Sequence, residues 1–165
     1  MNYLKVSIGI FLVLAASRFV PHPPNFTSLI ALSFYVPALL GITFIPVLIF
    51  SFLLTDLIIG FHETTFFTWG SVLAIGLVSK YFQYNILKRM SGALIGALIF
   101  FLLTNLGVWI TSAHGINSTS LINVCLLGLP FFGYSLISTL IFSAIIETIC
   151  KFKIAKNIIQ IYSYK

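Results

Sequence analysis

Two stretches of the sequence, residues 19–55 and 90–146, contain no Asp, Glu, Lys or Arg. A helix that crosses a membrane needs about 20 apolar residues, so each stretch is long enough to hold two spans. Over its 165 residues the chain is 59% hydrophobic and only 7% charged. A soluble domain carries far more charge. The sequence therefore predicts an integral membrane protein.

Polar and rigid segments divide the apolar sequence into six predicted helices. They form one all-α transmembrane domain, residues 1–165, with spans at about 4–20, 27–43, 44–61, 64–82, 90–111 and 121–149. Long apolar runs replace the alternation that a membrane β-barrel requires. The second break is the weakest, because Pro37 and Pro46 could instead kink a single helix. Pro130 could kink the last one.

The basic residues predict the orientation of these helices. With the N-terminus in the cytoplasm, eight of the nine Lys and Arg residues lie at cytoplasmic ends: Lys5, Lys80, Lys88, Arg89, Lys151, Lys153, Lys156 and Lys165. Only Arg18 lies on the other side. This asymmetry explains the net charge of +6 without any nucleic-acid partner. Residues 1–17 also resemble a signal peptide, and its cleavage would leave five spans.

In this topology the polar residues of the spans gather on the extracytoplasmic side. The candidate substrate-binding residues there are Arg18, His22, Asn25, Asp56, His62, Trp69, Asn105 and Trp109. Ionisable groups within a span are costly, and they usually face a bundle interior or an aqueous cavity. We expect Arg18 and Asp56 to pair, and the whole group to line a pocket for a small-molecule substrate.

These residues also have purely structural interpretations. The expected ion pair could merely fix the register of two helices, and Asn105 could hydrogen-bond between helices. The two Trp residues could belong to the aromatic belt at the membrane surface. The segment PHPPNFTS (21–28) could be only a rigid turn, with Asn25 or Thr27 capping the next helix. We expect this segment to shape the mouth of the pocket as well.

The sequence offers little support for catalysis or for a bound metal. His22, His62 and His114 all fall on the outer side, and imidazole suits transition metals. They lie in three different loops, however, so we name no metal ligand and keep a metal-handling protein as an alternative. No nucleophile with a positioned base and no phosphate-binding glycine loop is visible. We therefore expect no enzyme activity, no catalytic residue and no cofactor.

One packing motif stands out in the fifth predicted helix. The segment SGALIGALIF (91–100) places Gly92 and Gly96 at GxxxG spacing, near the cytoplasmic end. Small residues four apart let two helices approach closely. We mark both glycines as a candidate interface for a partner subunit, with packing inside the bundle as the alternative.

Four segments carry a resemblance to a known family: ASRFVPHPPNFTSLIAL (16–32), SFLLTDLIIGFH (51–62), GALIFFLLTNLGVW (96–109) and CLLGLPFFGYSLISTLIF (125–142). They resemble the signature blocks of a family of uncharacterised small bacterial inner-membrane proteins. That family is similar to the substrate-binding S components of energy-coupling-factor (ECF) transporters. The resemblance implies a six-helix, multi-pass protein of the bacterial inner membrane. It also implies that a vitamin or metal is captured under the loops joining helices 1–2, 3–4 and 5–6.

The resemblance further implies partners, namely an energising ATPase and a coupling subunit. S components meet the coupling subunit through small residues spaced AxxxA on helix 1. The segment KVSIGIFLVLAAS (5–17) lacks this spacing, so the protein either acts alone or uses the Gly92–Gly96 patch. Uptake of a small molecule is thus the leading prediction. A structural or assembly subunit of a larger membrane complex is the alternative.

Overall fold

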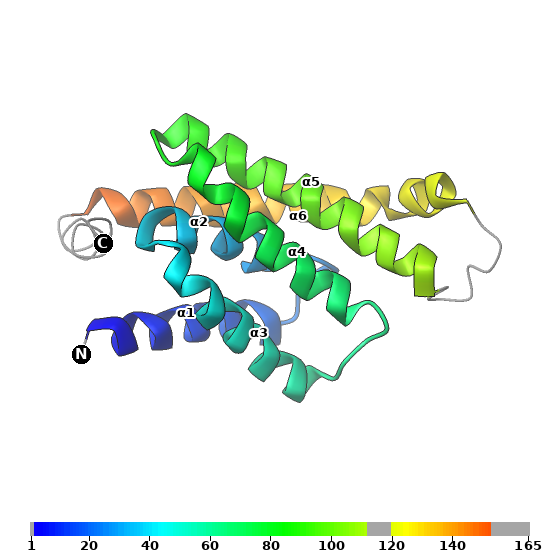
Figure 1. Ribbon diagram of the computed structural model, residues 1–165, viewed down its shortest axis with the longest axis horizontal. Coiled ribbons are helices and arrows are strands. Elements are labelled where there is room, and N and C mark those ends of the chain that lie inside the picture. The colour runs from blue at the N-terminus through cyan, green and yellow to red at the C-terminus, as the bar shows by residue number, and fades with distance from the viewer. Residues whose placement is uncertain (1, 112–119, 153–165) are drawn as a thin grey trace.

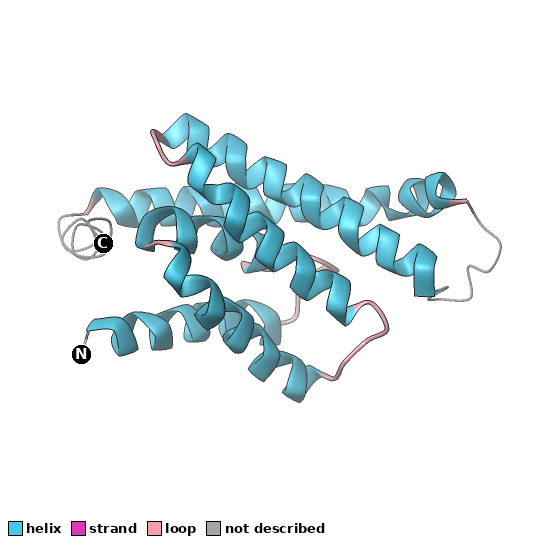
Figure 2. Cartoon of the chain, viewed as in Figure 1, coloured by secondary structure: helices cyan, strands magenta, loops and turns pink. Residues whose placement is uncertain are grey.

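The computed structural model describes residues 2–111 and 120–152, and its regular structure there is entirely helical (Figure 2). Two short 3-10 helices, η1 Ile42–Phe44 and η2 Ser79–Phe82, accompany six α-helices: α1 Asn2–Phe19, α2 Leu29–Leu40, α3 Ile45–Ile59, α4 Thr65–Val78, α5 Ile86–Thr111 and α6 Leu121–Lys151. These six lie where the sequence predicts six helices, and the all-α class is confirmed. His114, Lys153, Lys156 and Lys165 lie outside the described residues.

The weakest predicted break, between α2 and α3, is a turn and not a kink. Gly41 has a φ of 99°, a left-handed conformation that glycine adopts without steric cost, and its N–H bonds to the carbonyl of Pro37 at 3.0 Å. Pro46 then lies in the first turn of α3, where helices need no N–H donor. As a result α2 is shorter than the predicted 27–43.

Helix α2 is the centre of the bundle. It contacts each of the other five α-helices, and every residue from Leu29 to Pro37 is buried. A helix that is apolar on all sides suits such an enclosed position. Its Phe34 and Tyr35 pack with Phe44 and Phe52 in the main hydrophobic core.

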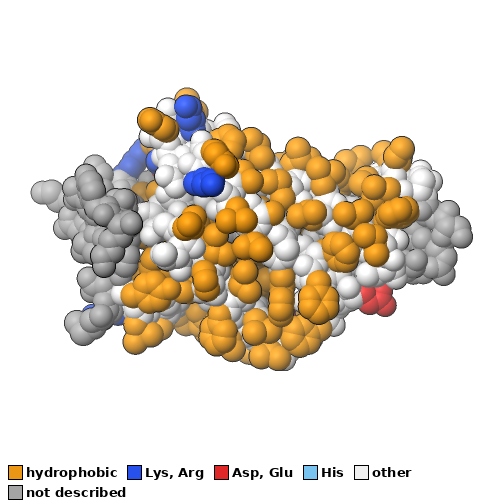
Figure 3. Space-filling model, in the orientation of Figure 1, with side chains coloured by type: hydrophobic (Ala, Val, Ile, Leu, Met, Phe, Trp, Pro, Cys, Tyr) orange, Lys and Arg blue, Asp and Glu red, His pale blue; other side chains and the backbone are white. Residues whose placement is uncertain are grey.

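The helices run up and down between two chemically different ends (Figure 1). The odd-numbered helices begin, and the even-numbered ones end, at the end where N and C are marked. The Lys and Arg side chains visible in Figure 3 gather at that end, while the opposite end shows an acidic side chain. We call the first the basic end. Apolar side chains cover much of the flank between the two ends, as a surface in contact with lipid would.

Three helical segments in the described chain are long and apolar enough to cross a membrane: Ile42–Ile59, α5 and α6, the last of which continues through Pro130. Helix α2 has 12 residues and α4 has 14. At 1.5 Å per residue they rise about 18 and 21 Å, short of the roughly 30 Å apolar layer. The six-span topology therefore stays a prediction.

The two GxxxG glycines of α5 already pack against other helices of the same chain. A Cβ atom at Gly92 would lie 2.5 Å from the ring of Phe34 in α2 and 2.7 Å from Phe82 in η2. At Gly96 it would lie 3.0 Å from Ile75 in α4. Both glycines are buried. Their assignment as a partner interface is thus corrected, because the surface that they present is already covered by this chain's own helices.

This packing makes Gly92 sensitive to even one added methyl group. We expect Gly92→Ala to lower the free energy of unfolding by about 1–3 kcal/mol, because Phe34 is fully buried and cannot move aside. Gly70→Ala in α4 is the matched control, since its new Cβ would have nothing within 4 Å. Thermal unfolding in detergent measures both. Equal melting of Gly92→Ala and the wild type would contradict the packing.

Candidate functional site

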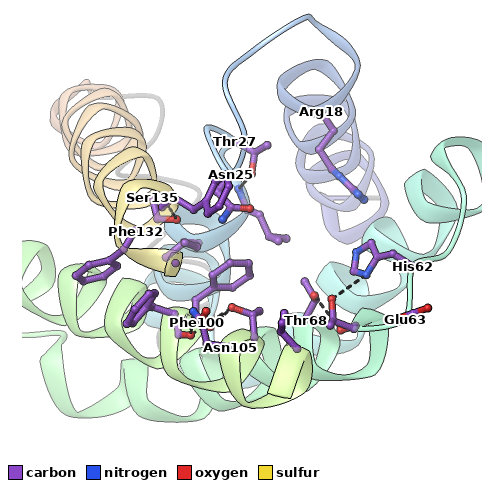
Figure 4. Close-up of a pocket in the computed structure, with 18 of the residues that line it drawn as sticks. Arg18, Asn25, Thr27, His62, Glu63, Thr68, Phe100, Asn105, Phe132 and Ser135 are labelled. Atoms are coloured by element: carbon purple, nitrogen blue, oxygen red, sulfur yellow. Dashed lines mark hydrogen bonds between the residues drawn. The ribbon is translucent and has the colours of Figure 1, made fainter. Parts of the chain in front are cut away.

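A cavity of about 830 Å³ lies at the end of the bundle opposite the basic end. Its walls come from all six α-helices, including the last turn of α1, and from the α1–α2 and α3–α4 connections. Figure 4 shows labelled side chains from these elements around a common space, with Arg18 and His62 on one side and Asn25, Phe132 and Ser135 on the other. The volume falls within the range of about 300–1,000 Å³ typical of ligand pockets.

The α1–α2 connection is fastened at its base and along its length. Ser17 and Ser28, on either side of it, share a hydrogen bond of 2.7 Å between their hydroxyls. Asn25 adopts a positive φ of 61°, and its carbonyl accepts a hydrogen bond of 3.4 Å from Ser138 in α6. Ser28 occupies the N-cap position of α2 without a side-chain cap bond, and Thr27 Oγ1 accepts a hydrogen bond of 3.4 Å from the N–H of Leu29, the first residue of α2, as one of the two sequence-based alternatives expected. The connection is held as a wall of the cavity.

The structure has the ion pair predicted between Arg18 and Asp56. Arg18 Nη2 lies 2.7 Å from Asp56 Oδ1, and the indole N–H of Trp69 donates to Asp56 Oδ2 at 2.8 Å. The guanidinium also bonds to the hydroxyl of Thr55 and stacks over Phe52, 4.4 Å from the ring centroid. Asp56 is only 1% exposed. Its charge is thus neutralised and enclosed by α1 and α4.

Five of the eight predicted site residues line the cavity: Arg18, His22, Asn25, His62 and Asn105. Asp56, Trp69 and Trp109 do not. Asp56 is held by Arg18 and by Trp69, whose N–H bonds to the carboxylate. Trp109 lies on α5 with 44% of its surface exposed. The structure thus does not bring these three predicted site residues to the wall of the cavity.

Asn105 connects α5 to α6 in the cavity wall. Its amide N–H donates to the carbonyl of Phe101 at 2.7 Å. A Cβ atom at Gly128 would lie 2.5 Å from Asn105 Oδ1, so a larger residue there would displace the Asn105 amide. Both residues line the cavity. The Asn105 side chain is thus fixed in position and still faces the cavity.

Sequence reasoning missed the aromatic part of the site. The cavity is also lined by six Phe residues that come from four parts of the chain: Phe52, Phe61, Phe100, Phe101, Phe131 and Phe132. Phe101 and Phe132 pack with their ring centroids 4.7 Å apart. With 17 Phe in the chain, residue type alone could not separate these from rings that face lipid. The spacing of Gly128, Phe132 and Ser135 on one face of α6 is the signal that could have found them.

Two histidines at the rim form hydrogen bonds with neighbouring residues. His22 Nδ1 lies 2.7 Å from the carbonyl of Pro23, which can only accept, so Nδ1 carries the proton. His62 Nδ1 lies 3.1 Å from the hydroxyl of Thr64. Glu63 is exposed beside them. In the part of the chain that the structure describes, no three His, Cys, Asp or Glu side chains group as metal ligands do.

A second buried ion pair, not predicted from the sequence, lies at the basic end. Arg89 of α5 binds both carboxylate oxygens of Glu147 in α6, with Nε–Oε1 and Nη2–Oε2 distances of 2.7 Å. Its Nη1 also donates to the carbonyl of Gln83 at 3.1 Å. From the sequence, Arg89 is interpreted only as one of the basic residues at the cytoplasmic ends of the helices. The one signal was that Glu147 is the sole acidic residue after Glu63.

Within the described residues, a helical fold, an apolar flank and three segments long and apolar enough to cross a bilayer indicate a helical membrane protein. The chain belongs to a family of unknown function (DUF6580), whose family model matches residues 2–159. No curated protein and no solved structure matches the chain.

The ion pair beside the cavity generates a stability prediction. We expect Asp56→Asn to lower the free energy of unfolding by about 3–5 kcal/mol, because it leaves the Arg18 charge buried without its partner. Arg18→Gln combined with Asp56→Asn should recover part of this loss. Glu63→Gln, at an exposed carboxylate, is the control and should melt like the wild type. Strictly additive losses in thermal unfolding would show that the two charges are not coupled.

Proposed function

We propose that the protein binds a small molecule in this cavity at the extracytoplasmic side of the bacterial inner membrane and takes part in its uptake, as S components of ECF transporters do. The observation that carries the proposal is the cavity itself. It combines about 830 Å³ of space, an aromatic lining and a few converging polar groups such as Arg18, His62 and Asn105. Pockets for small molecules generally have this composition.

The distribution of charge supports the proposed orientation. Lys and Arg gather at the basic end, and cytoplasmic loops carry an excess of these residues in membrane proteins. The cavity at the other end would then open away from the cytoplasm. In the proposed topology all six α-helices lie within the membrane. The shortness of α2 is compatible with this, because the other five helices enclose it and it need not match the lipid thickness alone.

The lining also suggests which kind of molecule fits. Arg18 is the one cationic Lys or Arg side chain among the described lining residues, and Asp56 already neutralises it. What remains inside the cavity is a set of rings, hydroxyls, amides and imidazoles, and the carboxylate of Glu63 lies at its exposed rim. Aromatic rings stack on flat apolar groups, while amides and hydroxyls bond to polar edges. The proposed substrate is therefore a flat heterocycle with little net charge, such as a vitamin or a related micronutrient.

The energy source is a separate part of the proposal. The resemblance to S components implies an ATPase and a coupling subunit as partners. Gly92 and Gly96 are buried against Phe34 and Ile75, so a partner would have to contact another surface. The apolar flank of the bundle remains exposed, and a partner subunit would contact the protein there.

The proposal is tested by looking for a retained ligand. Native mass spectrometry of the gently solubilised wild type should show a bound small molecule. Asn105→Leu should lower its occupancy, with an affinity loss of about tenfold for one missing hydrogen bond. Asn123→Leu makes the same change at an exposed α6 residue outside the cavity and should retain the ligand.

Two results would contradict the proposal. One is a wild type that retains no small molecule and binds none from a panel of vitamins and heterocycles. The other is equal occupancy in the wild type and in Asn105→Leu, which would place the ligand outside the cavity.

A further inference from the structure

The face of α6 that points into the bundle carries an oxygen-bearing side chain at every fourth residue. Ser135, Thr139, Ser143 and Glu147 are 2%, 0%, 1% and 6% exposed. Residues four apart lie on one face of an α-helix and are separated by about 6 Å along its axis. The four groups therefore form a buried ladder about 18 Å long.

The ladder connects the two polar regions of the molecule. Ser135 lines the cavity, as its position in Figure 4 shows. Glu147, at the other end, is the carboxylate held by Arg89 near the basic end. Thr139 and Ser143 lie between them, where the bundle is otherwise packed with apolar side chains. The ladder thus runs from the cavity to the inner ion pair.

Two hydroxyls in the middle of the ladder, on Thr139 and Ser143, make no hydrogen bond to their own helix. Thr139 Oγ1 is buried without a partner in the described chain, and Ser143 Oγ has the buried Tyr35 hydroxyl as its neighbour. Other buried hydroxyls bond to their own helix: Ser33 to Leu29 and Ser71 to Thr68, both at 2.7 Å. That internal bond is the usual solution for a helical Ser or Thr. Thr139 and Ser143 do not use it, although nothing in their sequence prevents it.

Tyr35 brings a second helix to the same place. It lies on α2, which packs against α6, and its hydroxyl is near enough to the Ser143 hydroxyl and the Glu147 carboxylate for hydrogen-bond interactions with both. The residue is 1% exposed. Tyr35, Ser143 and Glu147 therefore form one buried polar cluster, and Thr139 lies one helical turn from Ser143 without a protein partner. Buried polar groups without protein partners generally mark a bound water or ion.

The spacing and the charges favour water over a cation. Residues four apart are separated by about 6 Å along the helix axis, a step that one water with two hydrogen bonds of about 2.8 Å each can bridge. A cation would need an anionic ligand. The one carboxylate here, Glu147, already gives both oxygens to the positive charge of Arg89. Hydroxyls also suit water because each can donate one hydrogen bond and accept others.

We propose that α6 binds a file of water molecules between Ser135 and Glu147, and that this file conducts protons between the cavity and the basic end. Each hydroxyl or water accepts a proton from its neighbour on the cavity side and donates its own proton onward. Glu147 is the last acceptor, and its carboxylate becomes a carboxylic acid. Release of that proton at the basic end restores the ion pair, so one proton enters and one leaves.

The surroundings of Glu147 fit this role as a terminal acceptor. The ionisable side chains around it are Arg89 from α5, Tyr35 from α2 and Cys150 from its own helix. Arg89 keeps its charge throughout and holds the carboxylate in place at 2.7 Å. Ionisable groups buried in membrane helices commonly serve proton relays. The proposed water file needs water in the cavity at one end. It does not depend on which small molecule the cavity binds.

Proton flux into proteoliposomes tests the proposal. The wild type is reconstituted with a pH-sensitive dye inside the vesicles, and a potassium gradient with valinomycin supplies the voltage. We expect proton entry above that of protein-free vesicles. Thr139→Val removes the hydroxyl at constant shape and should lower this flux by about tenfold, the factor that about 1.4 kcal/mol corresponds to. Ser143→Ala and Tyr35→Phe should also lower it.

Matched controls separate loss of the file from general damage. Thr139→Ser keeps the hydroxyl and should retain the flux. Ser71→Ala removes a buried hydroxyl that bonds to its own helix, and it should conduct like the wild type. Wild-type flux no greater than that of empty vesicles would overturn the proposal. So would unchanged flux in folded Thr139→Val, or an equal loss in Ser71→Ala.

Discussion

The Arg18–Asp56 ion pair is the interaction on which the cavity end depends. A buried carboxylate is paired with a guanidinium that lines the cavity, and the carboxylate alone would be strongly unfavourable in the apolar bundle. Asp56 satisfies its second oxygen with the indole of Trp69, and Arg18 adds contacts to Thr55 and the ring of Phe52. The pair therefore joins α1, α3 and α4 at one point. Arg18 can then face the cavity without leaving a free charge in it.

Tight packing between the helices elsewhere in the bundle confines the cavity to one end. Gly92 and Gly96 let α5 press against α2 and α4, and Gly128 lets α6 meet Asn105. Toward the rim the chain turns through polar connections, and Ser138 holds one of them to α6. The result is a bundle that is solid around α2 and hollow at one end. An apolar interior with a polar rim is the arrangement that small-molecule capture requires.

The sequence predicts the elements of this molecule better than their rotation about their own axes. Six helices, the Arg18–Asp56 pair and the cavity-forming connections follow from charge and apolar patterns. Hydropathy alone does not say which way each helix faces, because these helices are apolar on nearly every side. For that reason Trp69 was expected in the pocket but lies bonded to Asp56, and the lining Phe residues were missed. The Arg89–Glu147 pair joins residues 58 positions apart, which no local pattern reveals.

Uptake requires a cavity that opens to the extracytoplasmic side, and cysteine accessibility reports the side to which it opens. In a chain with Cys125 and Cys150 replaced by Ser, single cysteines are placed at Glu63, on the exposed cavity rim, and at Lys88, at the exposed basic end. A membrane-impermeant maleimide is added to whole cells with a permeable outer envelope. The account predicts that Glu63→Cys is labelled in these cells and that Lys88→Cys is labelled only after the inner membrane is opened. Labelling of Lys88→Cys alone in unopened cells would contradict it.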